Sequence, residues 1–517
     1  MQEIELKFLV PKARLKGLLR QAKVKSSEVT QMAAHYYDTS DQKLAQAGIG
    51  LRIRREGDTW VQTIKAGGDG IAARLEHNAL LDNEQVQAML KSQKLMPDLT
   101  IYKDTSIEPL LADFKLKKLT KKLSRLYVTD IERITRLVTE DDNGAKSSIE
   151  IAYDYGDIIH GEDDNQRQSI QEIEFELVSG DLDFLFTTAK TWCKRYKLYL
   201  STVTKAERGG LLLHNQDYSP AIKANLKQLD VEADTSMPAF IRAVVHNCLL
   251  QILPNSSAIV AGSQDYEHVS QLHDGIQRLH TSLKTLQNFS DQLNPEWLPI
   301  LEQTASLLDD YGKLSYLSDY VEYKLRQQGA PAVDWSTDID DIKITPIDTV
   351  RANDFQLTLL EMIAFTMSDP SIEPQADKLA FDKVAKNLSK QYDKLLKALQ
   401  SFVDSSENKA DSTDKDKLAQ LYYHLTSLRY LSEFAAPLYH KKESKKTLKR
   451  WLKRVKKAQK TLNCHLNKVY YQQHYKQKAS TDANALYGAG WLAASQKQSG
   501  KRCQKRLDKV QDSDRFW

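Results

Sequence analysis

The sequence predicts an α+β protein in which a strand-rich first part precedes an all-helical second part. Up to about residue 219, short runs of residues alternate between polar and apolar, which is the side-chain period of a β-strand. From about residue 236 onward, apolar residues recur at steps of three and four, as they do along a helix. Thirteen of the twenty glycines lie in residues 1–219, where turns between strands need them.

The first strand is predicted at residues 3–10, where acidic and basic residues share one face and apolar residues share the other. Helices are predicted near residues 11–23 and 181–197. Short strands at regular spacing predict an antiparallel sheet or barrel. Further alternating runs lie at residues 51–54, 60–65, 74–78, 149–154 and 172–177, and Arg133 and Lys205 are assigned to additional candidate strands.

The second part is predicted to be a bundle of paired antiparallel helices. Prolines are predicted to break its helices, because a proline cannot continue a helix without the loss of a backbone hydrogen bond. The predicted breaks are Pro254, Pro295, Pro331 and Pro370. We therefore divide the chain into a first domain at residues 1–213, a linker at 214–235 and a helical domain at 236–517.

Composition excludes several classes of protein. The 73 basic and 69 acidic side chains leave a formal net charge of only +4, so we expect no nucleic-acid partner. The four cysteines are widely spaced and predict neither a zinc site nor a disulfide framework. The N-terminus lacks the pattern of a signal peptide, and no uninterrupted apolar run approaches the roughly 18 residues of a membrane helix. We expect a cytoplasmic protein with no membrane partner.

The polar faces of the predicted strands carry charges of both signs. In a closed barrel one set of faces points inward. A dry interior with so many charges would be very unfavourable, whereas a hydrated tunnel lined by carboxylates and bases is suited to a hard cation and a polyanion. The alternative is a set of solvated outer faces, and the run Glu172, Glu174 and Glu176 taken alone favours that alternative.

Glu3-x-Glu5-x-Lys7 resembles the N-terminal signature of the CYTH domain, the fold of the triphosphate tunnel metalloenzymes. The similarity continues in the family's order to about residue 213, through Tyr37-Asp38-Thr39, Leu51-Arg52-Ile53-Arg54, Thr63-Ile64-Lys65, Asp154, residues 172–176 and residues 201–209. The resemblance implies an eight-stranded antiparallel β-barrel that forms a tunnel, with flanking helices, and a divalent metal, Mg²⁺ or Mn²⁺.

The resemblance also implies roles for individual residues. The implied metal ligands are Glu3, Glu5, Glu172, Glu174 and Glu176. The implied substrate-binding residues are Lys7, Arg52, Arg54, Lys65, Arg133 and Lys205. The implied catalytic residues are Lys65, Glu76 and Asp154, with either carboxylate as the group that orients water.

The function expected from this resemblance is hydrolysis of inorganic triphosphate, or another short polyphosphate, to pyrophosphate and phosphate. One alternative is an adenylate cyclase or a nucleoside or thiamine triphosphatase on the same barrel. Another is a polyphosphate-binding protein without catalysis. The sequence has no obvious nucleobase pocket, which favours the small inorganic substrate.

The helical part resembles the CHAD domain, which commonly follows CYTH and binds polyphosphate through histidines and basic residues. The similarity lies in residues 267–280 and 428–434. Several expected charged residues are replaced, by Ser270, His273, His280, Ala419, Tyr422 and Thr426. Long polyphosphate is a further expected partner, and ten of the seventeen residues from Lys441 to Lys457 are Lys or Arg. A solvated helix face is the alternative interpretation of that run.

Overall fold

The computed structural model describes residues 2–517 except 69–70, 93, 143–144, 408–412 and 440–444. The chain forms two compact units. The first comprises Met1–Ile222, Ile252–Gln264 and Val350–Ala364, and the second comprises Lys223–Gln251, Asp265–Thr349 and Phe365–Trp517. Two segments from the helical half of the sequence therefore fold as part of the first unit.

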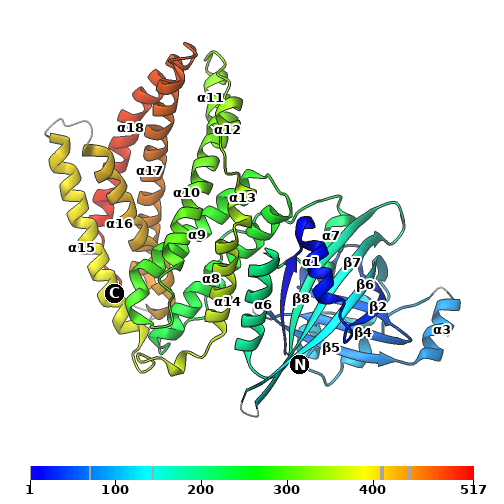
Figure 1. The fold of residues 1–517 in the computed structure, drawn as a ribbon. Helices are drawn as coiled ribbons and strands as arrows, with labels where there is room; N and C mark the ends of the chain where they lie inside the picture. Colours follow the sequence, from blue (N-terminus) through cyan, green and yellow to red (C-terminus); the bar gives the residue numbers. More distant parts are fainter. Residues whose placement is uncertain (1, 69–70, 93, 143–144, 408–412, 440–444) are drawn as a thin grey trace. The chain divides into compact units, whose positions relative to one another are not determined.

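The first unit is built on a closed antiparallel barrel (Figure 1). Its strands follow the order β5-β4-β3-β2-β6-β7-β8-β1, and the barrel closes because β1 also pairs with β5. The prediction of an eight-stranded antiparallel barrel is confirmed. The two-residue strand β9 (Tyr199–Leu200) adds to β1. The eight barrel strands are β1 (Gln2–Leu9), β2 (Glu28–Thr39), β3 (Ile49–Glu56), β4 (Thr59–Ala66), β5 (Ala73–Leu81), β6 (Leu123–Asp142), β7 (Ala145–His160) and β8 (Arg167–Ser179).

Strand register brings the charged faces together. Lys7 on β1 is opposite Glu174 on β8, and Lys65 on β4 is opposite Glu76 on β5. Because side chains alternate along a strand, these residues all point to the interior. The other face is apolar: Phe8 and Phe175 are completely buried, with ring centroids 5.7 Å apart, and Phe175 packs in turn against Trp192.

In the described part of residues 2–213, seven α-helices accompany the barrel strands. The two helices predicted near residues 11–23 and 181–197 are confirmed as α1 and α6. The assignment of Lys205 to a strand is wrong: it is the first residue of α7, because Thr204 caps that helix by accepting the backbone N–H of Glu207 at 3.0 Å. The helices are α1 (Lys12–Ala22), α2 (Lys43–Gln46), α3 (Asn83–Lys91), α4 (Glu108–Leu111), α5 (Leu116–Thr120), α6 (Leu182–Tyr196) and α7 (Lys205–Leu213).

The rest of the described chain is helical, which confirms the predicted all-α second part. Pro295, Pro331 and Pro370 lie at helix ends or between helices, as predicted. The helices are α8 (Met237–Ala261), α9 (Tyr266–Leu286), α10 (Trp297–Tyr316), α11 (Glu322–Gln327), α12 (Ser336–Asp340), α13 (Pro346–Arg351), α14 (Asn353–Met367), α15 (Ala380–Glu407), α16 (Thr413–Ala435), α17 (Lys445–Lys478) and α18 (Ala485–Gln511).

Helix α8 departs from the prediction, because it continues through Pro254. Apolar packing around this helix offsets the backbone hydrogen bond that the proline removes. Within the described part of the chain, α8 is also the one helix long and apolar enough to cross a membrane by length and composition, and 78% of its most apolar 18-residue window is buried inside the protein. A core helix has both of these properties.

His35 gives the barrel a specific acid sensitivity. Its ring stacks on Trp60 with the centroids 6.3 Å apart, and its Nδ1 is buried without a hydrogen-bond partner among the described residues. Burial, with a smaller contribution from Arg125, lowers the pKa of His35 from 6.5 to about 4. As the pH falls from 6.5 to 4, His35 therefore binds a proton in the unfolded chain but not in the folded chain. This difference lowers the free energy of unfolding over that pH range.

We expect His35→Phe to reduce the loss of barrel stability between pH 7 and pH 5 by about 1 kcal/mol, after allowance for partial exposure of the ring. Urea unfolding at the two pH values measures this difference. The matched control is Ile53→Val, at the position paired with His35 across β2 and β3, which should lower stability equally at both pH values. An unchanged pH dependence in His35→Phe would contradict this assignment.

Candidate active site

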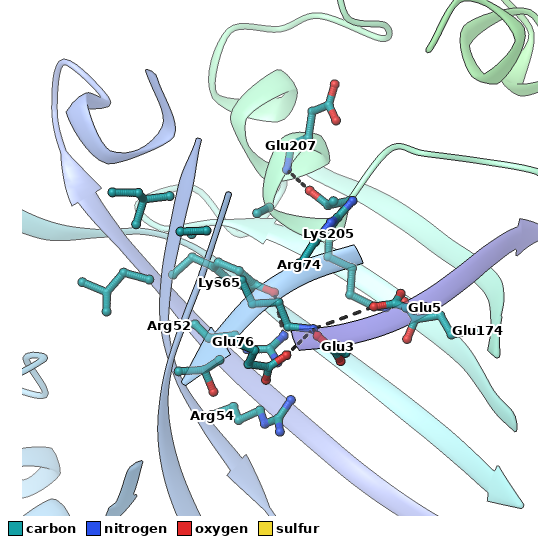
Figure 2. Close-up of a pocket in the computed structure, with 18 of the residues that line it drawn as sticks. Glu3, Glu5, Arg52, Arg54, Lys65, Arg74, Glu76, Glu174, Lys205 and Glu207 are labelled. Carbon is teal, nitrogen blue, oxygen red and sulfur yellow. Dashed lines mark hydrogen bonds and ion pairs between the residues drawn. The ribbon is translucent and has the colours of Figure 1, made fainter. Parts of the chain in front are cut away.

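The barrel encloses a cavity of about 1100 Å³ whose wall is densely charged (Figure 2). Ten carboxylates face seven Lys or Arg side chains, a formal excess of three negative charges. The carboxylates belong to Glu3, Glu5, Glu28, Asp38, Glu56, Glu76, Glu150, Glu174, Glu176 and Glu207. The basic residues are Lys7, Arg52, Arg54, Lys65, Arg74, Arg133 and Lys205.

One charged cluster forms where β1, β4 and β5 meet. The Lys65 Nζ lies 2.8 Å from a carboxylate oxygen of Glu3, 2.7 Å from one of Glu76 and 3.8 Å from one of Glu5. Figure 2 shows these four side chains converging from three strands. Because the Lys7 Nζ also lies 3.8 Å from Glu5, two ammonium groups serve these three carboxylates, one positive charge fewer than the acids gathered there.

Burial changes the acidity of the carboxylates in this part of the cavity wall. Burial, together with a hydrogen bond to Glu76, raises the pKa of Glu3 to about 8. Burial also raises the pKa of Glu176 to about 7. For Glu76, burial opposes ionisation, but the hydrogen bond from Glu3 and the charge of Lys65 outweigh it and lower the pKa. Buried carboxylates whose pKa lies near neutral pH gain from an added counter-charge, and their oxygen donors suit a hard divalent cation.

A second cluster surrounds Lys205. Asp154, Glu172 and Glu174 offer oxygens that all lie within 4.8 Å of one another, a spacing that a metal ion accepts. The centre of this acidic triad is however taken by the Lys205 ammonium, which lies 2.7, 2.5 and 2.8 Å from the three carboxylates in that order. An internal cation therefore already supplies the charge that a metal would bring.

Arg133 and Lys7 complete this second cluster. Arg133 donates two hydrogen bonds of 2.7 Å to Asp154 and one of 2.6 Å to Glu174, while the Lys7 Nζ lies 3.4 Å from Glu174. Burial opposes ionisation of Glu174, but the charges of Lys205, Lys7 and Arg133 hold its pKa well below its usual range. In this cluster the negative charges of the carboxylates are therefore balanced by the positive charges of Lys205, Arg133 and Lys7.

The guanidinium groups of β3 are the ones best placed for an anion. Arg52 has the Tyr36 hydroxyl 3.3 Å from its Nη1, and its Nε is buried without a hydrogen-bond partner in the described part of the chain. Its neighbour Arg54 contacts Glu56. Burial and the charge of Arg52 lower the pKa of Arg54 to about 10. Two guanidinium groups side by side would be stabilised by phosphate oxygens between them.

The structure thus brings most of the predicted residues to one cavity. Asp154 and Glu172 are the exceptions, because both are fully buried and do not line the cavity. Asp154 pairs with the lining residues Arg133 and Lys205, and Glu172 pairs with the lining residues Lys205 and Lys7. Arg74 and Glu150 line the cavity but are absent from the predicted set. The sequence signal for them is strand alternation: Arg74 is two positions before Glu76 on β5, and Glu150 is four positions before Asp154 on β7.

The comparisons with known proteins agree with this architecture. Residues 1–209 match the family model of the CYTH domain, and residues 243–474 match that of the CHAD domain. The chain carries a CYTH domain followed by a CHAD domain. An inorganic triphosphatase from Haemophilus influenzae is 31% identical over 218 residues, which are 41% of this chain and 55% of that relative. The chain therefore spans about half the length of the curated relative it matches.

Two solved structures illustrate the separate domains. A CHAD domain from Ricinus communis covers 57% of this chain and 97% of its own, at 17% identity and a TM-score of 0.45. A Hippeastrum protein, described as an adenylyl cyclase with a dominant triphosphatase activity, covers 42% of this chain and 98% of its own, at 14% identity and a TM-score of 0.30. Both TM-scores are below 0.5.

The acidic triad makes Lys205 important for the stability of the CYTH domain. We expect Lys205→Met to lower the free energy of unfolding by about 3–5 kcal/mol, because it leaves buried carboxylates short of a counter-charge. Thermal and urea unfolding measure the change. The control is Lys190→Met, which removes a half-exposed lysine paired with Glu361 and should cost less than about 1 kcal/mol. Equal effects of the two substitutions would show that the triad does not depend on Lys205.

Proposed function

We propose that this chain is a metal-dependent phosphohydrolase that cleaves inorganic triphosphate, or another short polyphosphate, to pyrophosphate and phosphate inside the barrel. The observation that carries the proposal is the cavity wall, on which seven basic side chains and ten carboxylates face one another. We propose that residues 1–213 form the catalytic domain, residues 214–235 the linker and residues 236–517 a polyanion-binding domain.

The basic residues account for substrate binding. Triphosphate carries several negative charges, and phosphoryl transfer spreads charge over the oxygens of the transferred group. Arg52 and Arg54 on β3 and Arg74 on β5 line the cavity and offer guanidinium groups to those oxygens. Because these groups are fixed before substrate arrives, they stabilise the charge with little reorganisation. Lys7, Arg133 and Lys205 are bound to acids on one side and extend the basic surface on the other.

The carboxylates account for metal binding. Glu3, Glu5 and Glu176 are the ligands we propose for Mg²⁺ or Mn²⁺, with Glu174 shared between the metal and Lys205. When bound, the divalent ion supplies charge neutralisation and Lewis acidity at the phosphate oxygens. Glu172 we assign instead to holding Lys205, because it lies behind the wall and its oxygen is 2.5 Å from that ammonium.

We propose that the remaining predicted residues position other side chains or orient the attacking water. Glu76 stays ionised beside Lys65, and it is the carboxylate at the cavity wall that we propose accepts a hydrogen bond from the attacking water. Lys65 holds Glu3 and Glu76 at fixed positions and is directed into the cavity. Asp154 acts on Arg133 through two parallel hydrogen bonds, which fix the plane of that guanidinium group.

The size of the cavity favours a second candidate, hydrolysis of a nucleoside triphosphate. A volume of about 1100 Å³ exceeds the needs of an inorganic triphosphate, and part of the wall is formed by Met32, Tyr36, Tyr127 and Leu211. Tyr36 and Tyr127 stack on each other with centroids 4.8 Å apart. An apolar, aromatic wall of this kind can contact a base. Comparing substrates directly separates the two candidates.

We expect phosphate release from tripolyphosphate with Mg²⁺ or Mn²⁺ to exceed that from ATP, thiamine triphosphate, pyrophosphate or long polyphosphate. Chelation with EDTA should abolish it, and Glu5→Gln should lower kcat at least 100-fold while the melting temperature changes little. The control Glu84→Gln, on the outer helix α3, should keep full activity. Preference for ATP would select the second candidate, and a folded chain inert towards the whole panel would select a binding protein without catalysis.

We further propose that long polyphosphate binds the helical domain along α17 and α18. Helix α17 contains no acidic residue, and its residues 445–460 include nine Lys or Arg. Residues 497–509 of α18 include six Lys or Arg and one Asp. The helices are antiparallel neighbours, with Arg454 donating to the backbone oxygen of Lys509 at 3.2 Å and His465 within 2.7 Å of Ser499. The two basic runs therefore lie side by side (Figure 1).

The apolar residues of α17 lie on the buried face of the helix, opposite its basic residues. Leu448, Trp451, Val455 and Leu462 are buried, and Leu452 is half-buried, so the exposed face is left to the basic side chains. Residues 441–444 of the predicted basic run lie outside the described residues. An exposed surface with so little acidic compensation attracts polyanions at long range.

We expect the triple substitution Lys453→Ala, Lys457→Ala and Lys505→Ala to weaken binding of long polyphosphate at least tenfold at about 100 mM salt and to reduce its salt dependence. Calorimetric titration measures both quantities. The matched control removes the same charge from α15 through Lys390→Ala, Lys394→Ala and Lys397→Ala. Equal losses would mean that overall charge is responsible, and no loss in the first variant would exclude this face.

A further inference from the structure

We propose that Gln356 on α14 and Ser257 on α8 are positioning residues for Lys205, acting through the backbone segment that precedes it. The proposal rests on the proposed function, because it concerns the cation that Lys205 contributes to the cavity. Both residues lie in the segments Ile252–Gln264 and Val350–Ala364, which match the CHAD domain model in sequence and yet fold as part of the barrel unit.

The segment in question runs from β9 to the start of α7. Residues 201–204 are neither helix nor strand, so their backbone N–H groups need partners elsewhere. On the barrel side, the backbone N–H of Ser201 donates to the carbonyl of Lys7 at 2.9 Å. The segment is therefore hydrogen-bonded to Lys7, the β1 residue whose side chain is another cation of the cavity.

The helices supply the partners on the other side. The backbone N–H of Leu200 donates to Gln356 Oε1 at 2.7 Å, and the backbone N–H of Thr202 donates to Ser257 Oγ at 3.0 Å. Gln356 and Ser257 are 0% and 2% exposed. A buried N–H that loses its acceptor is destabilising, because water does not replace the bond. These two bonds therefore restrict the path of the segment strongly.

Both acceptors are themselves fixed. Gln356 Nε2 donates to the carbonyl of Val350 at 2.7 Å, so its amide cannot turn away from Leu200. The Ser257 hydroxyl donates to the carbonyl of Leu253 at 2.7 Å, which aims its lone pairs at Thr202. The cavity beside the segment measures about 20 Å³, room for about one water. The segment thus has little freedom to adopt another path.

The segment ends at Lys205. Thr204 caps α7, and Lys205 follows as the first helical residue, with its ammonium in the acidic triad. On the far side of this turn, the Tyr127 hydroxyl donates to the carbonyl of Ala206 at 2.9 Å. The chain around Lys205 is consequently held from the barrel wall by Tyr127 and from the helices by Gln356 and Ser257. Because the triad distances are near 2.7 Å, a small displacement of the segment would separate the charges.

The test uses the full-length chain and a matched control. Gln356→Leu and Ser257→Ala remove the two acceptors while keeping most of the side-chain volume. Asn255→Leu is the control: Asn255 is equally buried on α8 and bonds the backbone of Ile222 at 3.1 and 2.8 Å, away from the Lys205 segment. All variants are compared well below their melting temperatures, so that loss of fold is excluded by circular dichroism.

We expect Gln356→Leu and Ser257→Ala to lower kcat/KM for tripolyphosphate at least tenfold, and Asn255→Leu to change it less than threefold at a similar loss of melting temperature. The decisive readout is a double-mutant cycle with Lys205→Gln. If Gln356 acts through Lys205, Gln356→Leu should change kcat/KM less than twofold in the Lys205→Gln chain. Rescue by Ser257→Thr, which keeps the hydroxyl, is a second expected outcome.

The same fold-change of Gln356→Leu in both backgrounds would overturn the proposal, as would an equal effect of Asn255→Leu. If the unmodified chain releases no phosphate from tripolyphosphate, the proposed function fails instead. The cycle is then measured through the calorimetric affinity for tripolyphosphate, which needs no turnover, and additivity there would overturn the positioning role.

Discussion

The barrel depends on mutual compensation among the charges it encloses. Asp154, Glu172 and Glu174 are buried, and buried carboxylates each carry a desolvation penalty of several kcal/mol. Lys205 and Arg133 offset this penalty with ion pairs of 2.5–2.8 Å. Removing one member would leave the others without compensation, so the network behaves as a unit.

The two charged clusters at the cavity differ in how far their carboxylates are compensated by cations. Around Lys205, three carboxylates meet two close cations and the nearby Lys7. Around Lys65, three carboxylates meet its ammonium, with Lys7 3.8 Å from Glu5, and burial raises the pKa of Glu3 to about 8. An added divalent cation gains little at the cluster around Lys205 and more at the cluster around Lys65. This difference is the physical reason for placing the metal with Glu3, Glu5 and Glu176, although the acidic triad has the closer spacing of oxygens.

The barrel fold and most of its lining could be predicted because strand alternation is a local property. A one-residue slip would reverse every side chain of a strand, so charges at alternate positions in several strands had to share one interior. The pairing of Lys205 with three acids was not predictable in this way, because it depends on contacts across 31–51 positions of the sequence. Its assignment to a strand failed because the β-branched residues before it favour strands, whereas the capping pattern of Thr204 and Glu207 is the signal of a helix.

No sequence pattern marks Gln356 or Ser257. A single amide on a helix and a single hydroxyl on another are common, and only the fold shows that they meet the same short segment. The two compact units explain why: segments of α8 and α14 far along the chain complete the unit that contains the barrel. The division of the sequence into a strand-rich and a helical half follows local periodicity, and local periodicity carries no information on which helices bury which backbone groups.

The groups that hold the charged residues in place are themselves neutral. Tyr127, Thr204, Ser257 and Gln356 all act through hydrogen bonds to backbone near Lys205. A charged residue in this role would alter the balance of the cavity, because an extra charge at 4 Å is worth about 4 kcal/mol even at an effective dielectric constant of 20. Neutral donors and acceptors fix geometry without that cost. Substitution of a charged residue changes the charge and the geometry of the site together, whereas substitution of a neutral one changes the geometry alone. The neutral residues are therefore where the contribution of precise placement can be measured separately from the contribution of charge.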